Sequence, residues 1–114
     1  MSVESAILRF RSAALEKGEF HEDSSRDHEL HAQMASAWIE LESTGETGRL
    51  AFSALLEDES NHVRCWVATQ LLAHGDESAV SVLRALVSDG GLLGFEAKIV
   101  LKEWEADRLK PPFK

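Results

Sequence analysis

The sequence predicts an all-α fold, and three observations lead to this prediction. Apolar residues recur three or four positions apart along most of the chain, which is the spacing of helices with one buried face. No segment alternates apolar and polar residues over a useful length, so no strand is expected. Both prolines of the 114-residue chain lie near its end, where they interrupt no predicted helix.

The first predicted helix spans residues 2–17. Ser2 is a suitable N-cap, and Glu4 places a negative charge in the first turn, where the helix dipole favours it. Gly18 follows the last turn. Both ends of this helix are therefore predicted from local signals.

A polar link, residues 19–27, leads to the second helix. Ser24 and Asp27 have the three-residue spacing of a capping box, which indicates a helix start. We expect this helix to end near Thr44 and Gly45.

The third helix is expected to begin at Thr47 and to run through Leu55. It closes at the acidic turn that precedes the most strongly periodic segment of the chain, Asp58–Leu72. The apolar residues of that segment recur at helical spacing: Val63, Trp66, Val67, Ala68, Leu71 and Leu72. Ser60 or Asn61 can cap this central helix, and Gly75 is placed to end it in a left-handed conformation.

Two further helices complete the predicted fold. Asp76 can cap the fifth helix, which the glycines at 90 and 91 interrupt, and the sixth carries apolar residues from Leu93 to Trp104. We predict one helical domain over residues 1–107 and a C-terminal tail over residues 108–114.

The predicted helices repeat with a similar internal spacing. Ala35, Ala68 and Ala97 are each followed by two apolar residues three and four positions later. The intervals between these alanines are 33 residues (35 to 68) and 29 residues (68 to 97). Such intervals are typical of stacked helical hairpins, so the six helices are expected to pair in order into a short α-α superhelix of about three hairpins.

Three motifs carry a resemblance to a known type of protein: Leu55-Leu56-Glu57-Asp58, Val63-Arg64-Cys65-Trp66-Val67-Ala68 and Gly90-Gly91-Leu92-Leu93-Gly94-Phe95-Glu96-Ala97. Over roughly residues 50–104 the chain resembles small bacterial HEAT-like (ARM-like) helical-repeat domains, nearer the short phycobilisome-lyase type of repeat. More narrowly, it resembles a family of small bacterial proteins known only as a domain of unknown function. The resemblance implies an α-superhelical fold and supplies no activity. Some small HEAT-like bacterial proteins occur among toxin-immunity genes, which suggests a toxin domain as one kind of partner.

The composition restricts the classes of partner. A net charge of -8 disfavours contact with nucleic acid phosphates and with anionic membranes. No apolar run approaches the ~20 residues that a membrane span needs. The N-terminus lacks the pattern of a secretory signal, and a single cysteine is compatible with a reducing compartment. We therefore expect an acidic, cytoplasmic protein that binds neither nucleic acid nor membranes.

Three histidines form a possible metal-binding cluster. His28 and His31 are one helical turn apart, and His21 lies just upstream. A divalent ion needs three or four converging donors, and no second pair of ligands occurs elsewhere in the sequence. We expect no metal and no other cofactor. A metal-binding protein or metal-dependent enzyme that uses these histidines is the alternative hypothesis.

Cys65 and His62 have the spacing of a nucleophile and a base on one helix. A cysteine hydrolase also needs a third, orienting group and an oxyanion hole, and the sequence contains no signature of either. We assign no catalytic residue and predict that the chain is not an enzyme.

Two other sets of side chains have structural and binding interpretations. Arg64 is expected to pair with Asp58 or Glu57 at the preceding turn, or else to bind a carboxylate of a partner. The three tryptophans, Trp38, Trp66 and Trp104, fall on the second helix of each hairpin. They are expected to pack in the core, and a partner-binding groove is the alternative.

The leading functional hypothesis is a non-enzymatic protein-interaction module, with a basic protein as its partner because opposite charge steers association. The predicted contact residues are polar positions of the second helices: Arg64, Thr69, Gln70, Glu96 and Lys102. The terminal hairpins of so short a stack have apolar faces to cover, so a monomer and a homodimer both remain open. Phe113 and the tail before it could cap one end or dock on a second copy.

Overall fold

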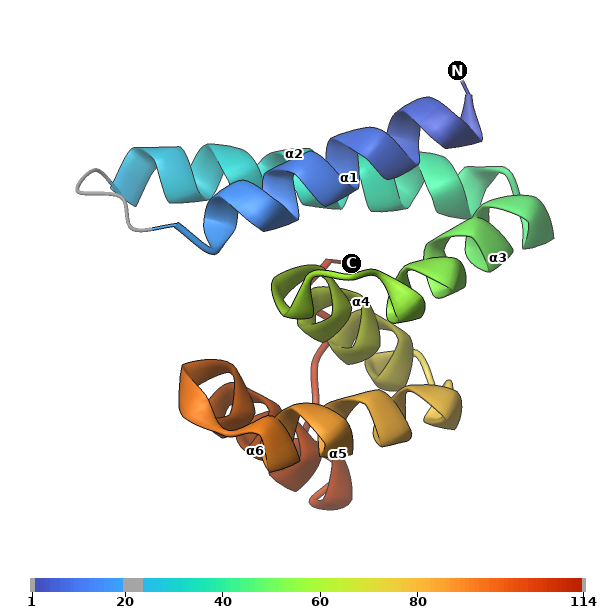
Figure 1. The fold of residues 1–114 in the computed structure, drawn as a ribbon. Coiled ribbons are helices and arrows are strands. Elements are labelled where there is room, and N and C mark those ends of the chain that lie inside the picture. The colour runs from blue at the N-terminus through green and yellow to red at the C-terminus, as the bar shows by residue number, and fades with distance from the viewer. Residues whose placement is uncertain (1, 20–23, 114) are drawn as a thin grey trace. The chain divides into compact units, whose positions relative to one another are not determined.

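The computed structural model describes residues 2–19 and 24–113. All regular structure within these residues is helical, which confirms the predicted fold class (Figure 1). The elements are α1 (Val3–Lys17), α2 (Ser24–Ser43), α3 (Glu46–Ala54), the 3-10 helix η1 (Leu55–Glu57), α4 (Asn61–Ala73), the 3-10 helix η2 (Glu77–Ala79), α5 (Val80–Asp89) and α6 (Gly91–Glu105).

The packing divides the chain into two compact units. The first unit contains the residues up to Ala54 together with Phe113, and the second contains Leu55–Pro112. The last described residue of the chain therefore belongs to the first unit. A single domain over residues 1–107 stays a prediction.

The helix starts follow the predicted caps in two places. The Ser2 hydroxyl accepts a hydrogen bond from the Ser5 amide at 3.0 Å and caps α1. At α4 the cap is Ser60, whose hydroxyl accepts from the Val63 amide at 3.4 Å. The Ser60 amide in turn donates to the Asp58 carboxylate at 2.9 Å, which holds the turn before the helix. Ser60 rather than Asn61 is therefore the N-cap.

The end of α4 has the backbone pattern of a Schellman motif. Gly75 takes a left-handed conformation with φ 92°, as the sequence predicts. Its amide donates to the Leu72 carbonyl, and the Asp76 amide donates to the Leu71 carbonyl, both at 2.9 Å. The Asp76 carboxylate then accepts from the Ser78 amide at 3.0 Å, so three residues lead from the end of α4 to the start of η2.

Four boundaries differ from the sequence-based expectation. Ser24 lies within α2 rather than before it. The third helix begins at Glu46 and ends at Ala54, because Leu55 already starts the tighter turns of η1. Asp76 caps η2, and α5 continues directly from it.

In the first unit, α1 and α2 form an antiparallel hairpin (Figure 1). Their ion pairs establish the direction: Arg9 of α1 contacts Glu40 of α2, whereas Glu16, further along α1, contacts Arg26 at the start of α2. Successive contacts thus run forward along α1 and backward along α2, so the two helices are antiparallel. The predicted pairing of these two helices is confirmed.

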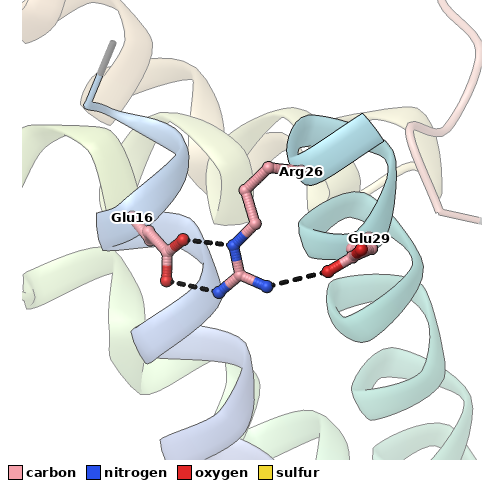
Figure 2. A network of polar contacts seen from close by, with 3 residues as sticks. All are labelled: Glu16, Arg26 and Glu29. Atoms are coloured by element: carbon pink, nitrogen blue, oxygen red, sulfur yellow. Dashed lines mark hydrogen bonds and ion pairs between the residues drawn. The ribbon is translucent and has the colours of Figure 1, made fainter. Parts of the chain in front are cut away.

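Figure 2 shows the polar network at the second of these contacts. Arg26 donates two hydrogen bonds to the Glu16 carboxylate, one of them from Nη2 at 2.7 Å, and a third to Glu29 at 2.9 Å. These hydrogen bonds raise the pKa of Arg26, and the hydrogen bonding to Glu16 has a larger effect than that to Glu29. The guanidinium therefore stays charged and holds the start of α2 against the end of α1.

An aromatic cluster forms the core of the first unit. Phe10 meets Phe52 and Phe113 edge-on, with ring centroids 5.0 and 5.4 Å apart. Trp38 packs edge-on against Phe52 at 4.9 Å. All four side chains are buried. The expectation that Trp38 packs in the core is confirmed, and the tail supplies a core residue of its own chain.

In the second unit, α4 packs against α5 and α6, and α5 and α6 form the predicted hairpin. Val63, Val67, Leu72, Leu83 and Leu86 are among its fully buried side chains. Pairing of the third helix with the fourth, and superhelical stacking of the hairpins, stay predictions.

Candidate functional site

The structure separates the five predicted contact residues into three groups by their exposure: half-buried, buried and exposed. Arg64 and Thr69 lie half-buried on α4 and use polar atoms within that helix. Arg64 Nη1 donates to Asn61 Oδ1 at 2.9 Å, in place of the expected pairing with Asp58 or Glu57, and its Nε is buried without a hydrogen-bond partner. The Thr69 hydroxyl donates to the Cys65 carbonyl at 2.8 Å. These two side chains mainly serve their own helix.

Gln70 requires a correction. Its side chain is 0% exposed, so it does not present its amide to a partner. Its Nε2 lies 3.0 Å from Nε2 of His74, one helical turn later. The Gln70 amide thus finds a hydrogen-bond partner inside the second unit, as buried polar groups generally do.

Glu96 and Lys102, the other two predicted contact residues, are exposed on α6. Between them lies a set of apolar side chains that the sequence analysis did not single out. Leu92, Phe95 and Ile99 are 75, 61 and 44% exposed. Their i, i+3, i+7 spacing places them on one face of the helix, and we call this set the α6 stripe.

The opposite face of α6 explains why the stripe is left uncovered. Gly94 and Ala97 are buried there, and Gly94 allows α5 and α6 to approach closely. A methyl group at Gly94 would lie 2.8 Å from the Leu86 carbonyl oxygen of α5. Helix α6 is apolar around much of its circumference. The second unit buries the face that carries Gly94 and Ala97, and the face that carries the α6 stripe stays exposed.

Charged residues border the α6 stripe on both sides. At 3.6 residues per turn, Lys98 and Lys102 lie along one edge, and Glu96 and Glu103 lie along the other. Glu103 also accepts a hydrogen bond from Arg108 at 3.2 Å. The stripe thus has a basic edge and an acidic edge.

The other large exposed apolar side chains among the described residues are divided among three helices. Leu8, Ile39 and Leu50 lie on α1, α2 and α3, one on each helix. Isolated apolar residues are common on protein surfaces, whereas a contiguous set is informative. The α6 stripe is therefore the strongest candidate site.

Cys65 is buried on α4, and its surroundings disfavour the thiolate. Burial raises the pKa of the thiol to about 11, and the negative charge of Glu96 acts in the same direction, while a hydrogen bond with Thr69 opposes them. A thiol with such a pKa is protonated at neutral pH and is a weak nucleophile. Its environment is that of a structural cysteine.

The histidine cluster is only partly described. His21 lies outside the described residues. His28 is exposed, and the ring of His31 packs against Phe113 with centroids 5.2 Å apart. Within residues 2–19 and 24–113, no group of three or more His, Cys, Asp or Glu side chains is arranged to hold a metal ion.

Comparison of the chain with family models finds no match, and comparisons with curated proteins and with solved structures find none either. In the described part of the chain, no helix combines the length and the apolar character needed to cross a membrane. The candidate site has exposed apolar side chains at its centre and charged side chains at its rim.

Proposed function

We propose that this chain is a non-enzymatic protein-interaction module whose contact surface includes the α6 stripe and its charged edges. The exposure of Leu92, Phe95 and Ile99 carries this proposal. Apolar side chains in water cost free energy roughly in proportion to their area, about 25 cal/mol per Å². An exposed apolar set rimmed by charged residues is typical of protein interaction sites.

Glu96 and Lys102 are the predicted contact residues that belong to the proposed contact surface. Both are exposed, and they lie on opposite edges of the α6 stripe. Arg64 and Thr69 are half-buried and play at most a supporting role. Gln70 is left out because it is buried.

The net charge of -8 supports a basic protein as a partner. Opposite charges accelerate encounter. The HEAT-like resemblance adds an immunity-type role, with a basic toxin domain as partner, to this proposal. A bacterial, cytoplasmic setting without nucleic acid or membrane contact belongs to the same proposal, supported by the single cysteine and the acidic composition.

The experiment is affinity capture from the cells that produce the protein, with three tagged chains compared at low and high salt. The wild type and Leu50→Glu should retain the same partner, whereas Phe95→Glu should lose it. Leu50 is the matched control because it is similarly exposed, 64% against 61%, but lies on α3. Release at high salt would support a basic partner. Retention of the partner by Phe95→Glu would show that the α6 stripe is not the contact surface.

A further inference from the structure

The α6 stripe has the residue spacing of a short coiled-coil seam. Leu92, Phe95 and Ile99 occupy positions a, d and a of a heptad, and the charged residues then fall at the flanking positions. Lys98 takes position g, and Glu96 and Glu103 take position e. All of these residues lie on one continuous helix, Gly91–Glu105.

The sorting of the charges restricts what can cover the stripe. A uniformly basic partner would meet Lys98 and Lys102 on one edge, and a uniformly acidic partner would meet Glu96 and Glu103 on the other. A matching helix must carry an apolar stripe with the two signs on opposite edges. A second copy of α6 has this pattern.

We propose that the α6 stripe binds the α6 stripe of a second copy of this chain, with the two helices parallel and related by a twofold axis. In a parallel pair, a residue at g faces the residue at e of the next heptad on the other helix, five positions further on. Lys98 of each copy then meets Glu103 of the other, so two oppositely charged pairs flank the seam. This inference rests on the proposed function because it concerns the same surface, and it names a second copy of the chain, in place of a basic protein, as the occupant of the α6 stripe.

The parallel direction follows from the same charges. In an antiparallel pair, like edges meet, and the edge that carries Glu96 and Glu103 would face itself. Lys102 occupies the next d position, at the end of the seam. Its aliphatic stem can extend the apolar contact while its ammonium group stays in water.

Three apolar residues per copy form a small interface, so the dimer should dissociate at low concentration. Sedimentation equilibrium of the full chain over a concentration series tests this. The wild type should shift from monomer towards dimer as concentration rises. Phe95→Glu should remain a monomer throughout, and Leu50→Glu should behave as the wild type does. Unchanged far-UV circular dichroism and thermal unfolding of Phe95→Glu ensure that the comparison concerns association.

A charge-reversal series tests the pairing directly. Lys98→Glu and Glu103→Lys should each weaken the dimer at least several-fold, because each places like charges opposite one another. The double variant Lys98→Glu/Glu103→Lys should restore it. An antiparallel dimer would give a different result: Glu103→Lys alone would strengthen association by facing Glu96.

Cysteine cross-linking provides an independent test of direction. Identical residues face each other along the whole seam of a parallel pair, so Leu92→Cys and Ile99→Cys should each form a disulfide with the same residue of the second copy. An antiparallel pair would link at most one of them. The native Cys65 is buried and does not compete.

A wild type that stays monomeric at every concentration would overturn the inference. If Phe95→Glu nevertheless loses a captured partner, the proposed function stands and a different protein covers the stripe. If Phe95→Glu changes neither association nor capture, both proposals fail.

Discussion

Cys65 lies on α4 with its thiol buried and near the negative charge of Glu96. These surroundings raise its pKa from a reference value of 9.0 to about 11, chiefly through burial. Because the pKa of the thiol is higher in the folded state, the folded state binds the thiol proton more tightly than the unfolded state does. The contribution to stability is therefore complete below pH 9 and is lost as the pH rises towards 11.

A pH series on the wild type and Cys65→Ala tests this linkage. Between pH 8 and pH 10.5 the wild type should lose about 2 kcal/mol more free energy of unfolding than the variant, at 1.36 kcal/mol per pKa unit. Other groups titrate in this range, and the variant removes their contribution from the comparison. Urea denaturation at each pH supplies the free energies. Parallel pH dependences of the two proteins would contradict the raised pKa.

Asp107 adopts the left-handed conformation, φ 59°, just after α6. Its amide donates to the Trp104 carbonyl at 3.0 Å, and the Arg108 amide donates to the Glu103 carbonyl at 2.8 Å, which is the Schellman pattern that Gly75 completes after α4. Glycine is the residue that takes this conformation most easily. Glycine would therefore adopt the backbone conformation at position 107 at a lower free-energy cost than Asp107 does.

Asp107→Gly should stabilise the protein by about 0.5–1 kcal/mol, because glycine relieves the backbone strain of a left-handed non-glycine residue. The neighbouring Ala106→Gly should instead destabilise it, since Ala106 has φ -86° and glycine there only adds freedom to the unfolded chain. Thermal unfolding of the two variants should shift in opposite directions. A shift of both in the same direction would show that backbone conformation does not control this site.

Among the elements, α3 packs closely beside α2 because one of its residues, Gly48, has no side chain. A side chain at Gly48 would collide with the Leu41 carbonyl and the Thr44 hydroxyl of the preceding segment. The obstacle is largely backbone, so it cannot rotate away. In an ordinary helix interior, alanine is more stable than glycine by roughly 0.5–1 kcal/mol, so this contact reverses the usual sign.

Gly48→Ala should therefore destabilise the first unit by about 2 kcal/mol or more. Thr47→Ala, an exposed neighbour on the same helix, should change stability by no more than about 0.5 kcal/mol. Trp38 lies in the core of the first unit, so its fluorescence in a Trp66→Phe/Trp104→Phe background reports the unfolding of that unit. A stabilised Gly48→Ala variant would mean that α3 does not approach α2 this closely.

Helix ends could be predicted from the sequence where their signals are local. Ser2 and Gly75 act within a few residues of the ends that they define, and both predictions are confirmed. Gly48 carries no such signal, because the need for glycine arises from a neighbouring helix. Periodicity located the buried face of α6 but does not reveal that Leu92, Phe95 and Ile99 form a second, exposed face. It likewise does not distinguish the buried Gln70 from the exposed Lys102, since both are polar positions on apolar helices.

At the scale of the whole molecule, the first unit is assembled from both ends of the chain. Phe113 follows two prolines and is 1% exposed, with Phe10 and His31 against its ring. The sequence predicts two alternative roles for this tail: it caps one end of its own chain, or it docks on a second copy. The structure shows Phe113 inside the core of its own first unit. The choice depends on the packing position beside Phe10 of α1 and His31 of α2, which the order of residues does not disclose.

Phe113→Ala should lower the free energy of unfolding of the first unit by about 3 kcal/mol, the usual order for removing a buried phenylalanine ring. The loss comes from the apolar area of the ring and from its edge-on contact with Phe10. The same Trp38 fluorescence, followed in urea, measures it. Lys110→Ala is the control, because Lys110 lies in the same tail with its side chain exposed, and it should leave stability nearly unchanged. A second variant that ends at Pro112 should match Phe113→Ala, since the ring is what the tail contributes to the core. Equal stability of Phe113→Ala and the wild type would show that the core of the first unit does not depend on the Phe113 ring.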